Sequence, residues 1–221
     1  MSERQYRLWP WPIRLLHWLL ATSFVLAYLS GEEALWLHAL AGHLIVLLIG
    51  LRLLGGLFST TPAALDQLWI TPTAVKAHLA ALLALRPLPH HGHHPLGALN
   101  ILALFSILLL LCVTGMALLA LDHGCGWLMG FFPAGMVWHK WLLAGSHELL
   151  AQFSLLLVLL HVVGVLGQSL IDRRNLSRSM LGGIMITLHR SRGWKSLWRR
   201  VAILLLVLLP SLIELLALRV L

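Results

Sequence analysis

Two histidines, His147 and His161, lie on one long apolar stretch that runs from Gly145 to Leu170. They are 14 residues apart. In an α-helix this spacing is a rotation about 40° short of four full turns, so both imidazoles leave nearly the same face, roughly 21 Å apart along the axis. An ionisable side chain within a membrane is costly and indicates a functional site, and neutral imidazole is the commonest protein ligand for metals. The spacing therefore predicts two stacked metal centres, one towards each side of a membrane.

The composition indicates that the helices carrying these residues cross a membrane. Of the 221 residues, 59% are hydrophobic and only 11% are charged, whereas a soluble domain is about 25% charged. A helix of roughly 20 residues crosses a bilayer, and we predict five spans, over residues 13–30, 35–57, 98–121, 147–170 and 201–221. The fifth is the least regular, because it contains Pro210 and Glu214. The fold class is therefore all-α: an integral membrane bundle with a four-helix core and a fifth, C-terminal transmembrane helix.

The basic residues predict how the bundle is oriented. Of the 16 Lys and Arg residues, all but Lys140 and Arg219 lie near the N-terminus or the start of span one, between spans two and three, or between spans four and five, counting Arg52 near the end of span two. Basic segments face the cytoplasm, so we place the N-terminus there and expect membrane lipid, and no nucleic acid, as a partner despite the net charge of +8. The first span begins without a small-residue cleavage site, so we expect no cleaved signal peptide. Within the connection 59–95 we expect a short helix on the membrane surface after Thr73.

Depth within the spans sorts four histidines into two pairs. His17 lies near the cytoplasmic start of span one, and His161 lies towards the same side in span four. His38 and His147 both lie near outer ends, in spans two and four. Each pair draws on two helices and could clamp a planar cofactor from both faces, which fits bis-histidine ligation of haem b in a helix bundle. The alternative is that all four are packing residues hydrogen-bonded to the backbone.

Other metal-binding side chains carry less information. His43 follows His38 by five residues, about 140° around the helix, so it either packs or replaces His38 as a ligand. The HHGHH tract, residues 90–94, is either a solvated loop or a metal site. Cys112 and Cys125 predict no disulfide, and the absence of a C-x-x-C-H motif excludes a covalently attached c-type haem.

Arg14 and Arg52 lie near the predicted cytoplasmic pair. A guanidinium suits a carboxylate geometrically, so both are candidates to bind haem propionates. Anchoring under the positive-inside rule is the alternative for both. Glycines near the ligands could let a porphyrin approach the backbone or could pack helices together; they are Gly42, Gly115, Gly145 and Gly164.

Several short motifs resemble those of a known family, the bacterial di-haem membrane cytochromes b of the cytochrome b561 and nickel–iron hydrogenase cytochrome b type. The resemblance covers roughly residues 7–182, and its motifs are RLLHW (14–18), LHALAGHLIVLLIGLRLLGG (37–56), GHHPLGAL (92–99), SHELLA (146–151) and LLHVVGVL (159–166). It implies that the axial ligands of the haem iron are His17, His38, His147 and His161, with His38 favoured over His43. GHHP departs from the family's G-H-N-P, with His94 in the Asn place.

The resemblance also implies a function. It implies two haems b, a bound quinone towards the cytoplasmic side, and electron transfer in a respiratory chain of the bacterial inner membrane. The redox partner would be a cytochrome c, a hydrogenase or another dehydrogenase, with this chain as an electron-transfer subunit that has no catalytic residues of its own. Residues 1–182 would form the di-haem domain, and residues 183–221 a basic interfacial segment and the fifth helix.

Two alternatives have a different function. One is a self-contained oxidoreductase that passes electrons from superoxide to quinone, as a related type of family member does. The other is a metal-ion transporter, which the 13 histidines would suit. Transport is disfavoured because spans one to four carry almost no acidic residue near their centres.

Overall fold

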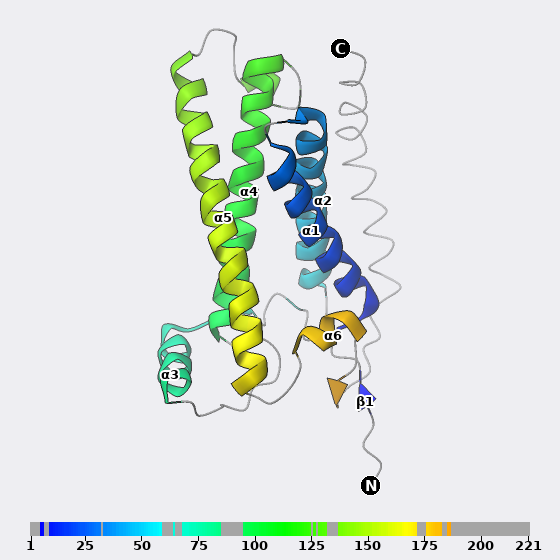
Figure 1. Ribbon diagram of the computed structural model, residues 1–221, viewed down its shortest axis with the longest axis vertical. Helices are drawn as coiled ribbons and strands as arrows, with labels where there is room; N and C mark the ends of the chain where they lie inside the picture. The colour runs from blue at the N-terminus through cyan, green and yellow to red at the C-terminus, as the bar shows by residue number, and fades with distance from the viewer. Residues whose placement is uncertain are drawn as a thin grey trace. The chain divides into compact units, whose positions relative to one another are not determined.

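The computed structural model describes residues 5–6, 9–31, 33–58, 64, 68–84, 95–124, 126, 128–131, 137–171, 176–182 and 185–186. Four long helices make up most of this part of the chain: α1 (Trp11–Ser30), α2 (Leu35–Leu57), α4 (Pro95–His123) and α5 (Val137–Ile171). Figure 1 shows them with the shorter elements α3 (Pro72–Leu83), α6 (Leu176–Gly182), β1 (Gln5–Tyr6) and β2 (Met185–Ile186). A 3-10 turn, η2 (Met129–Phe131), precedes α5. The predicted fifth span, the basic segment 187–200 and the HHGHH tract lie outside the described residues.

Within the described residues, four helices are long and apolar enough to cross a membrane. They coincide with the first four predicted spans, so the prediction of an all-α membrane helix bundle is confirmed. Their outward-facing side chains are apolar, as on Leu29, Leu110, Leu159 and Val163. In a bilayer such side chains face lipid, and the helices are held together by close packing and hydrogen bonds between them.

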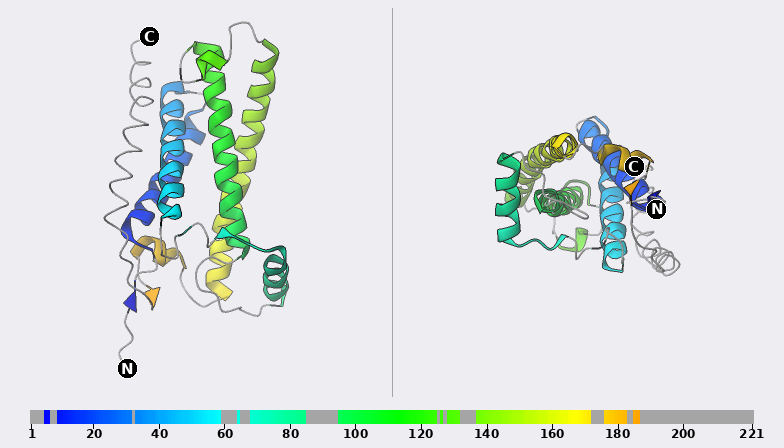
Figure 2. Two further views of the ribbon diagram at one scale, coloured as in Figure 1. Left: turned by 180° about the vertical axis from the view of Figure 1, so that it is seen from behind. Right: turned by 90° about the horizontal axis from the view of Figure 1, so that it is seen from below.

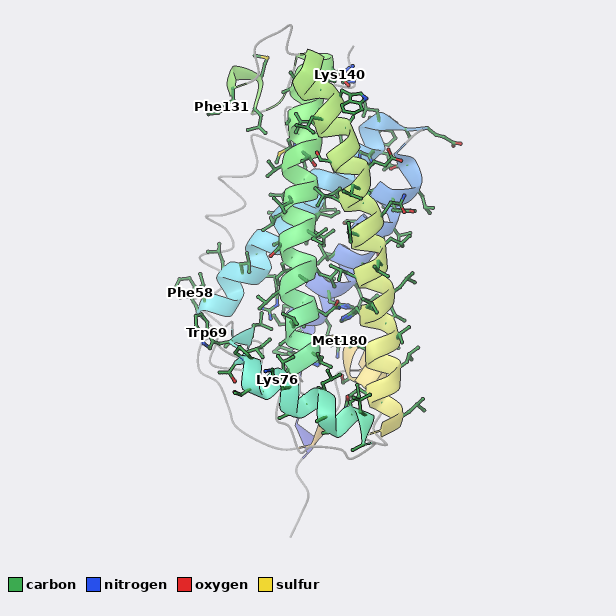
Figure 3. All side chains as sticks on the ribbon, turned by 90° about the vertical axis from the view of Figure 1, so that its left-hand side faces the viewer. Phe58, Trp69, Lys76, Phe131, Lys140 and Met180 are labelled. Carbon is green, nitrogen blue, oxygen red and sulfur yellow. The ribbon has the colours of Figure 1, made fainter. Side chains whose placement is uncertain are left out.

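The fourth span differs from its prediction at its start. We expected it to begin at His147, but α5 begins at Val137, so His147 lies well inside the helix. No proline interrupts VWHKWLLAGS, and Gly145 is tolerated within a helix at a cost of about 1 kcal/mol relative to Ala. An ion pair supports the added turns, since Lys140 Nζ lies 2.7 Å from Asp122 Oδ1 at the end of α4. Figure 3 shows Lys140 near the start of α5.

The ends of two helices follow ordinary capping rules. Thr71 caps α3: its hydroxyl accepts a 3.3 Å hydrogen bond from Ala74 N, and Pro72 occupies the first helical position, where no amide hydrogen is needed. After α4, Gly124 has φ +59° and donates its N–H to Ala120 O at 3.0 Å. This left-handed conformation is the usual way for a glycine to end a helix.

The chain divides into two compact units, and each long helix contributes to both. One unit takes residues 1–17, 52–104 and 157–198, and the other takes residues 18–51 and 105–156 within the part described. In the second unit the core lies mainly between α2 and α4, where Ala41, Ile45, Ile49, Leu108 and Ala117 are buried.

In the first unit, smaller elements surround the ends of the long helices. Figures 1 and 2 show α3 near the ends of α4 and α5, and α6 near the start of α1. α3 confirms the short helix expected after Thr73, and His78 on it is buried. The strands β1 and β2 pair antiparallel, Gln5 with Ile186 and Tyr6 with Met185. The exposed side chains of Phe58 and Trp69 (Figure 3) are typical of a membrane–water interface.

Candidate haem sites

His17 and His161 meet in the first unit. α1 supplies His17 and α5 supplies His161. Their ring centroids lie 6.3 Å apart with an angle of 43° between the planes. Asn100 connects α4 to α5 in the same unit, because its Nδ2 donates to Leu157 O at 3.4 Å. The structure therefore brings together the first of the two pairs that depth predicts.

His38 and His147 meet in the second unit. α2 supplies His38 and α5 supplies His147. Their ring centroids lie 5.9 Å apart with an angle of 70° between the planes. Both rings are half-buried. This is the second pair that depth predicts.

The separation of the rings in both pairs suits one metal ion between them. A bond from an imidazole nitrogen to a first-row metal such as zinc is about 2.0–2.1 Å long. Two nitrogens bound from opposite sides therefore lie about 4 Å apart, and the ring centroids, each roughly 1 Å behind its nitrogen, lie about 6 Å apart. The observed 6.3 and 5.9 Å agree with this value. Two ligands per centre suit haem iron, because the porphyrin supplies the four in-plane nitrogens.

Bare metal ions are bound differently, by three or more protein ligands in most structural and catalytic sites. Among the residues that the structure describes, no group of three or more His, Cys, Asp and Glu side chains is placed to hold a metal ion. The two histidine pairs are thus the metal-binding arrangements that this part of the chain offers.

Hydrogen bonds orient the rings of the second pair. His38 Nδ1 lies 2.8 Å from Ala27 O on α1. His147 Nδ1 lies 3.0 Å from Thr114 Oγ1 on α4. Each ring thus has its Nδ1 occupied, which leaves its Nε2 for another partner. Thr114 is not among the residues that the sequence alone predicts as functional; the polar Thr-Gly step inside an apolar span is the signal that could have indicated it.

His43 lies outside both pairs. Its Nδ1 is 2.8 Å from Ala39 O on its own helix, a bond that needs no other element. Of the two histidines on α2, His38 is the one whose ring faces His147. The geometry therefore favours His38 over His43 as a ligand candidate.

One of the four glycines singled out from the sequence lies against a ligand candidate. A Cβ on Gly115 would lie 3.0 Å from His147 Cε1 and 3.6 Å from its Nδ1. A Cβ on Gly42, Gly145 or Gly164 would meet no atom within 4 Å. Gly115 thus admits the imidazole of His147 to the surface of α4, and any larger residue there would displace it.

Arg14 and Arg52 have buried guanidinium nitrogens. Nε and Nη1 of Arg14 and Nη1 of Arg52 are buried and have no hydrogen-bond partner among the described residues. Arg14 precedes His17 by three residues on α1, a spacing that makes them neighbours on the helix surface. A residue that only anchors orientation keeps its charged head in water or among lipid headgroups, whereas a buried cation requires an anionic partner. The two carboxylates of a haem supply that chemistry.

A membrane-spanning bundle with paired, facing histidines has the architecture of a membrane-bound b-type cytochrome. Residues 8–183 match the sequence profile of a family described as prokaryotic cytochrome b561. The match covers well over half of the 221 residues, and the chain belongs to this family. Searches of curated proteins and of solved structures find no significant match. The protein is thus a multi-pass bacterial membrane cytochrome that binds b-type haem and takes part in electron transfer.

Proposed function

We propose that this cytochrome holds two haems b and transfers electrons between the quinone pool and a redox partner protein in a respiratory chain. His17 and His161 would hold one haem by its iron, and His38 and His147 would hold the other. The observation that carries the proposal is the pair of ring separations, 6.3 and 5.9 Å, each suited to one iron between two imidazoles. Residues 1–182 form the di-haem domain.

The haem supplies one-electron chemistry at its iron, with a potential set by the axial ligands and their surroundings. The chain's own residues would orient the haem and neutralise the negative charge of its propionates. Ala27 O and Thr114 Oγ1 hold the rings of His38 and His147. Arg14 and Arg52 would hold the propionates of the haem at His17 and His161, which would give their buried nitrogens charge-assisted partners. The apolar helices exclude water from both sites.

Two further parts of the proposal, the orientation of the protein in the membrane and the identity of its partners, are supported by the charge distribution and by the family resemblance. The distribution of Lys and Arg supports an N-terminus in the cytoplasm, and the resemblance supports the bacterial inner membrane, a quinone and a partner such as a cytochrome c, a hydrogenase or another dehydrogenase. Interconversion of quinol and quinone moves two electrons and two protons. Because each haem carries one electron at a time, every quinone requires two successive transfers through the chain.

Haem quantified per chain, with a reduced-minus-oxidised visible spectrum, tests the proposal. The purified wild type should show b-type bands and two haems per chain. His161→Ala and His147→Ala should each retain one haem, and His43→Ala, the matched control on α2, should retain two. One haem or none in folded wild-type protein would contradict the di-haem proposal. Two haems in His161→Ala would contradict the ligand set.

Rapid mixing with electron donors then tests the partners. A quinol analogue mixed with the oxidised wild type should reduce its haem fast enough to account for the rate of steady-state turnover. A cytochrome c or a dehydrogenase subunit should likewise exchange electrons with the haem. Reduction of the haems by superoxide, followed by their reoxidation by quinone with no partner protein present, would instead support the self-contained oxidoreductase.

A further inference from the structure

Thr114 is placed to control the imidazole of His147. Its Oγ1 lies 3.0 Å from Leu110 O and 2.9 Å from Leu111 O on its own helix, and 3.0 Å from His147 Nδ1 on α5. A hydroxyl has one proton to donate and two lone pairs that accept. With its proton given to the backbone of α4, the oxygen accepts a hydrogen bond from His147 Nδ1–H.

This arrangement selects one tautomer of His147. A neutral imidazole with its proton on Nδ1 has its lone pair on Nε2. The facing His38 is in the same state for a different reason, because Ala27 O, 2.8 Å from its Nδ1, is a carbonyl and can only accept. Both rings thus present Nε2 as the free donor of a lone pair. For His38 a backbone carbonyl selects the tautomer; His147 has the hydroxyl of Thr114 at 3.0 Å and also lies within hydrogen-bonding reach of the backbone of Leu111, and either acceptor requires the proton on Nδ1.

We infer that Thr114 is a positioning residue that sets the tautomer of His147 and, through it, the midpoint potential of the haem at the His38–His147 pair. The inference rests on the proposed function. An acceptor for Nδ1–H increases the electron density that the imidazole gives to the iron. This stabilises ferric over ferrous iron, so the hydroxyl of Thr114 lowers the midpoint potential of that haem.

Three variants test the hydroxyl separately from the space that it fills. Thr114→Val replaces it with a methyl group of similar size. Thr114→Ser keeps the hydroxyl and loses the methyl group. Ser154→Ala removes another buried hydroxyl, one that donates to Ala151 O on its own helix at 2.7 Å, and serves as the matched control.

The measurement is an optical redox titration of the purified full-length protein. Each variant is made in the wild type and in His161→Ala, where the remaining haem is the one at His38 and His147. Thr114→Val should raise that midpoint potential; a tenfold change in the ratio of ferric to ferrous stability corresponds to about 59 mV for one electron. Thr114→Ser and Ser154→Ala should leave it near the wild-type value. The low-spin ferric electron paramagnetic resonance signal of the same haem should change in Thr114→Val alone.

The outcomes separate this inference from the proposed function. An unchanged potential in Thr114→Val with two haems bound would overturn the inference and leave the di-haem proposal intact. An equal shift in Thr114→Ser would also overturn it, because packing would then be the cause. Loss of one haem in Thr114→Val but not in Thr114→Ser would support it. Fewer than two haems in the wild type would overturn the proposed function itself.

Discussion

Gly115→Ala should damage one haem site and leave the other intact. The added Cβ would lie 3.0 Å from His147 Cε1, whereas carbon atoms in favourable contact lie about 3.5–4.0 Å apart. The ring must therefore retreat by a few tenths of an ångström. The retreat would strain the 3.0 Å bond between His147 Nδ1 and Thr114 Oγ1, which fixes the ring of a ligand candidate that has to be held to within about 0.5 Å.

The expected energies decide whether Gly115→Ala stabilises or destabilises the site. Gly to Ala in a helix interior gains about 0.5–1 kcal/mol, and overpacking costs about 1–3 kcal/mol, so the clash outweighs the gain. A disturbed second shell commonly weakens metal binding by about 10–100-fold. We expect a weaker haem at the His38–His147 pair and an unchanged haem at the His17–His161 pair.

Two other glycines provide matched controls for Gly115→Ala. A Cβ on Gly97, near the start of α4, would meet nothing within 4 Å, and one on Gly31 would lie 3.6 Å from His38 Nδ1, an ordinary contact. Both Ala variants should retain two haems. The assay is haem per chain after dialysis, with a redox titration of each variant. Two haems with unchanged potentials in Gly115→Ala would refute the reasoning, because the ring would then have no fixed position against α4.

Substitutions at three further positions probe other parts of the chain. Arg52→Gln should lower the midpoint potential of the haem at the His17–His161 pair in a redox titration, because loss of a nearby positive charge favours ferric iron; Arg52→Lys, which keeps the charge, should lower it less. Thr71→Ala should remove the cap of α3, at a cost of about 1 kcal/mol, and should speed amide hydrogen exchange in the first turn of α3 with both haems retained. Lys140→Met should change thermal stability by less than about 1 kcal/mol, because the side chains of its ion pair with Asp122 are 54% and 32% exposed.

The pairing of the four histidines could be predicted from the sequence because span length limits where a helix can sit in a membrane. α1, α2 and α4 begin and end within three residues of their predicted bounds, so the positions of His17 and His38 along their own helices agree with the prediction. The start of α5 was predicted ten residues too late, at His147 instead of Val137, because the polar residues His139, Lys140 and Ser146 separate this first part of the helix from the apolar run that marks the span.

The residues around the ligands were harder to predict, because they depend on how each helix is rotated about its own axis. An amphipathic helix reveals its rotation by its polar face, but α4 is apolar all round. The polar Thr114–Gly115 step interrupts the apolar run of α4, but the sequence does not indicate which neighbouring helix the step faces. The carbonyl of Ala27 has no side-chain signal at all. The ligand candidates could therefore be predicted from the sequence, whereas the groups that hydrogen-bond to His38 and His147 could not.

The groups that surround the two histidine pairs differ in kind, and under the di-haem proposal this difference would act on the two midpoint potentials. Around His38 and His147 the structure places hydrogen-bond acceptors at Nδ1, which favour ferric iron. Arg14 and Arg52, in the same unit as His17 and His161, bring buried positive charge, which favours ferrous iron. Thr114→Val and Arg52→Gln should therefore move two different midpoint potentials in opposite directions. Because each variant removes one kind of group from one site, opposite shifts would follow from the local surroundings of each pair, and a general loosening of the bundle would move both potentials together.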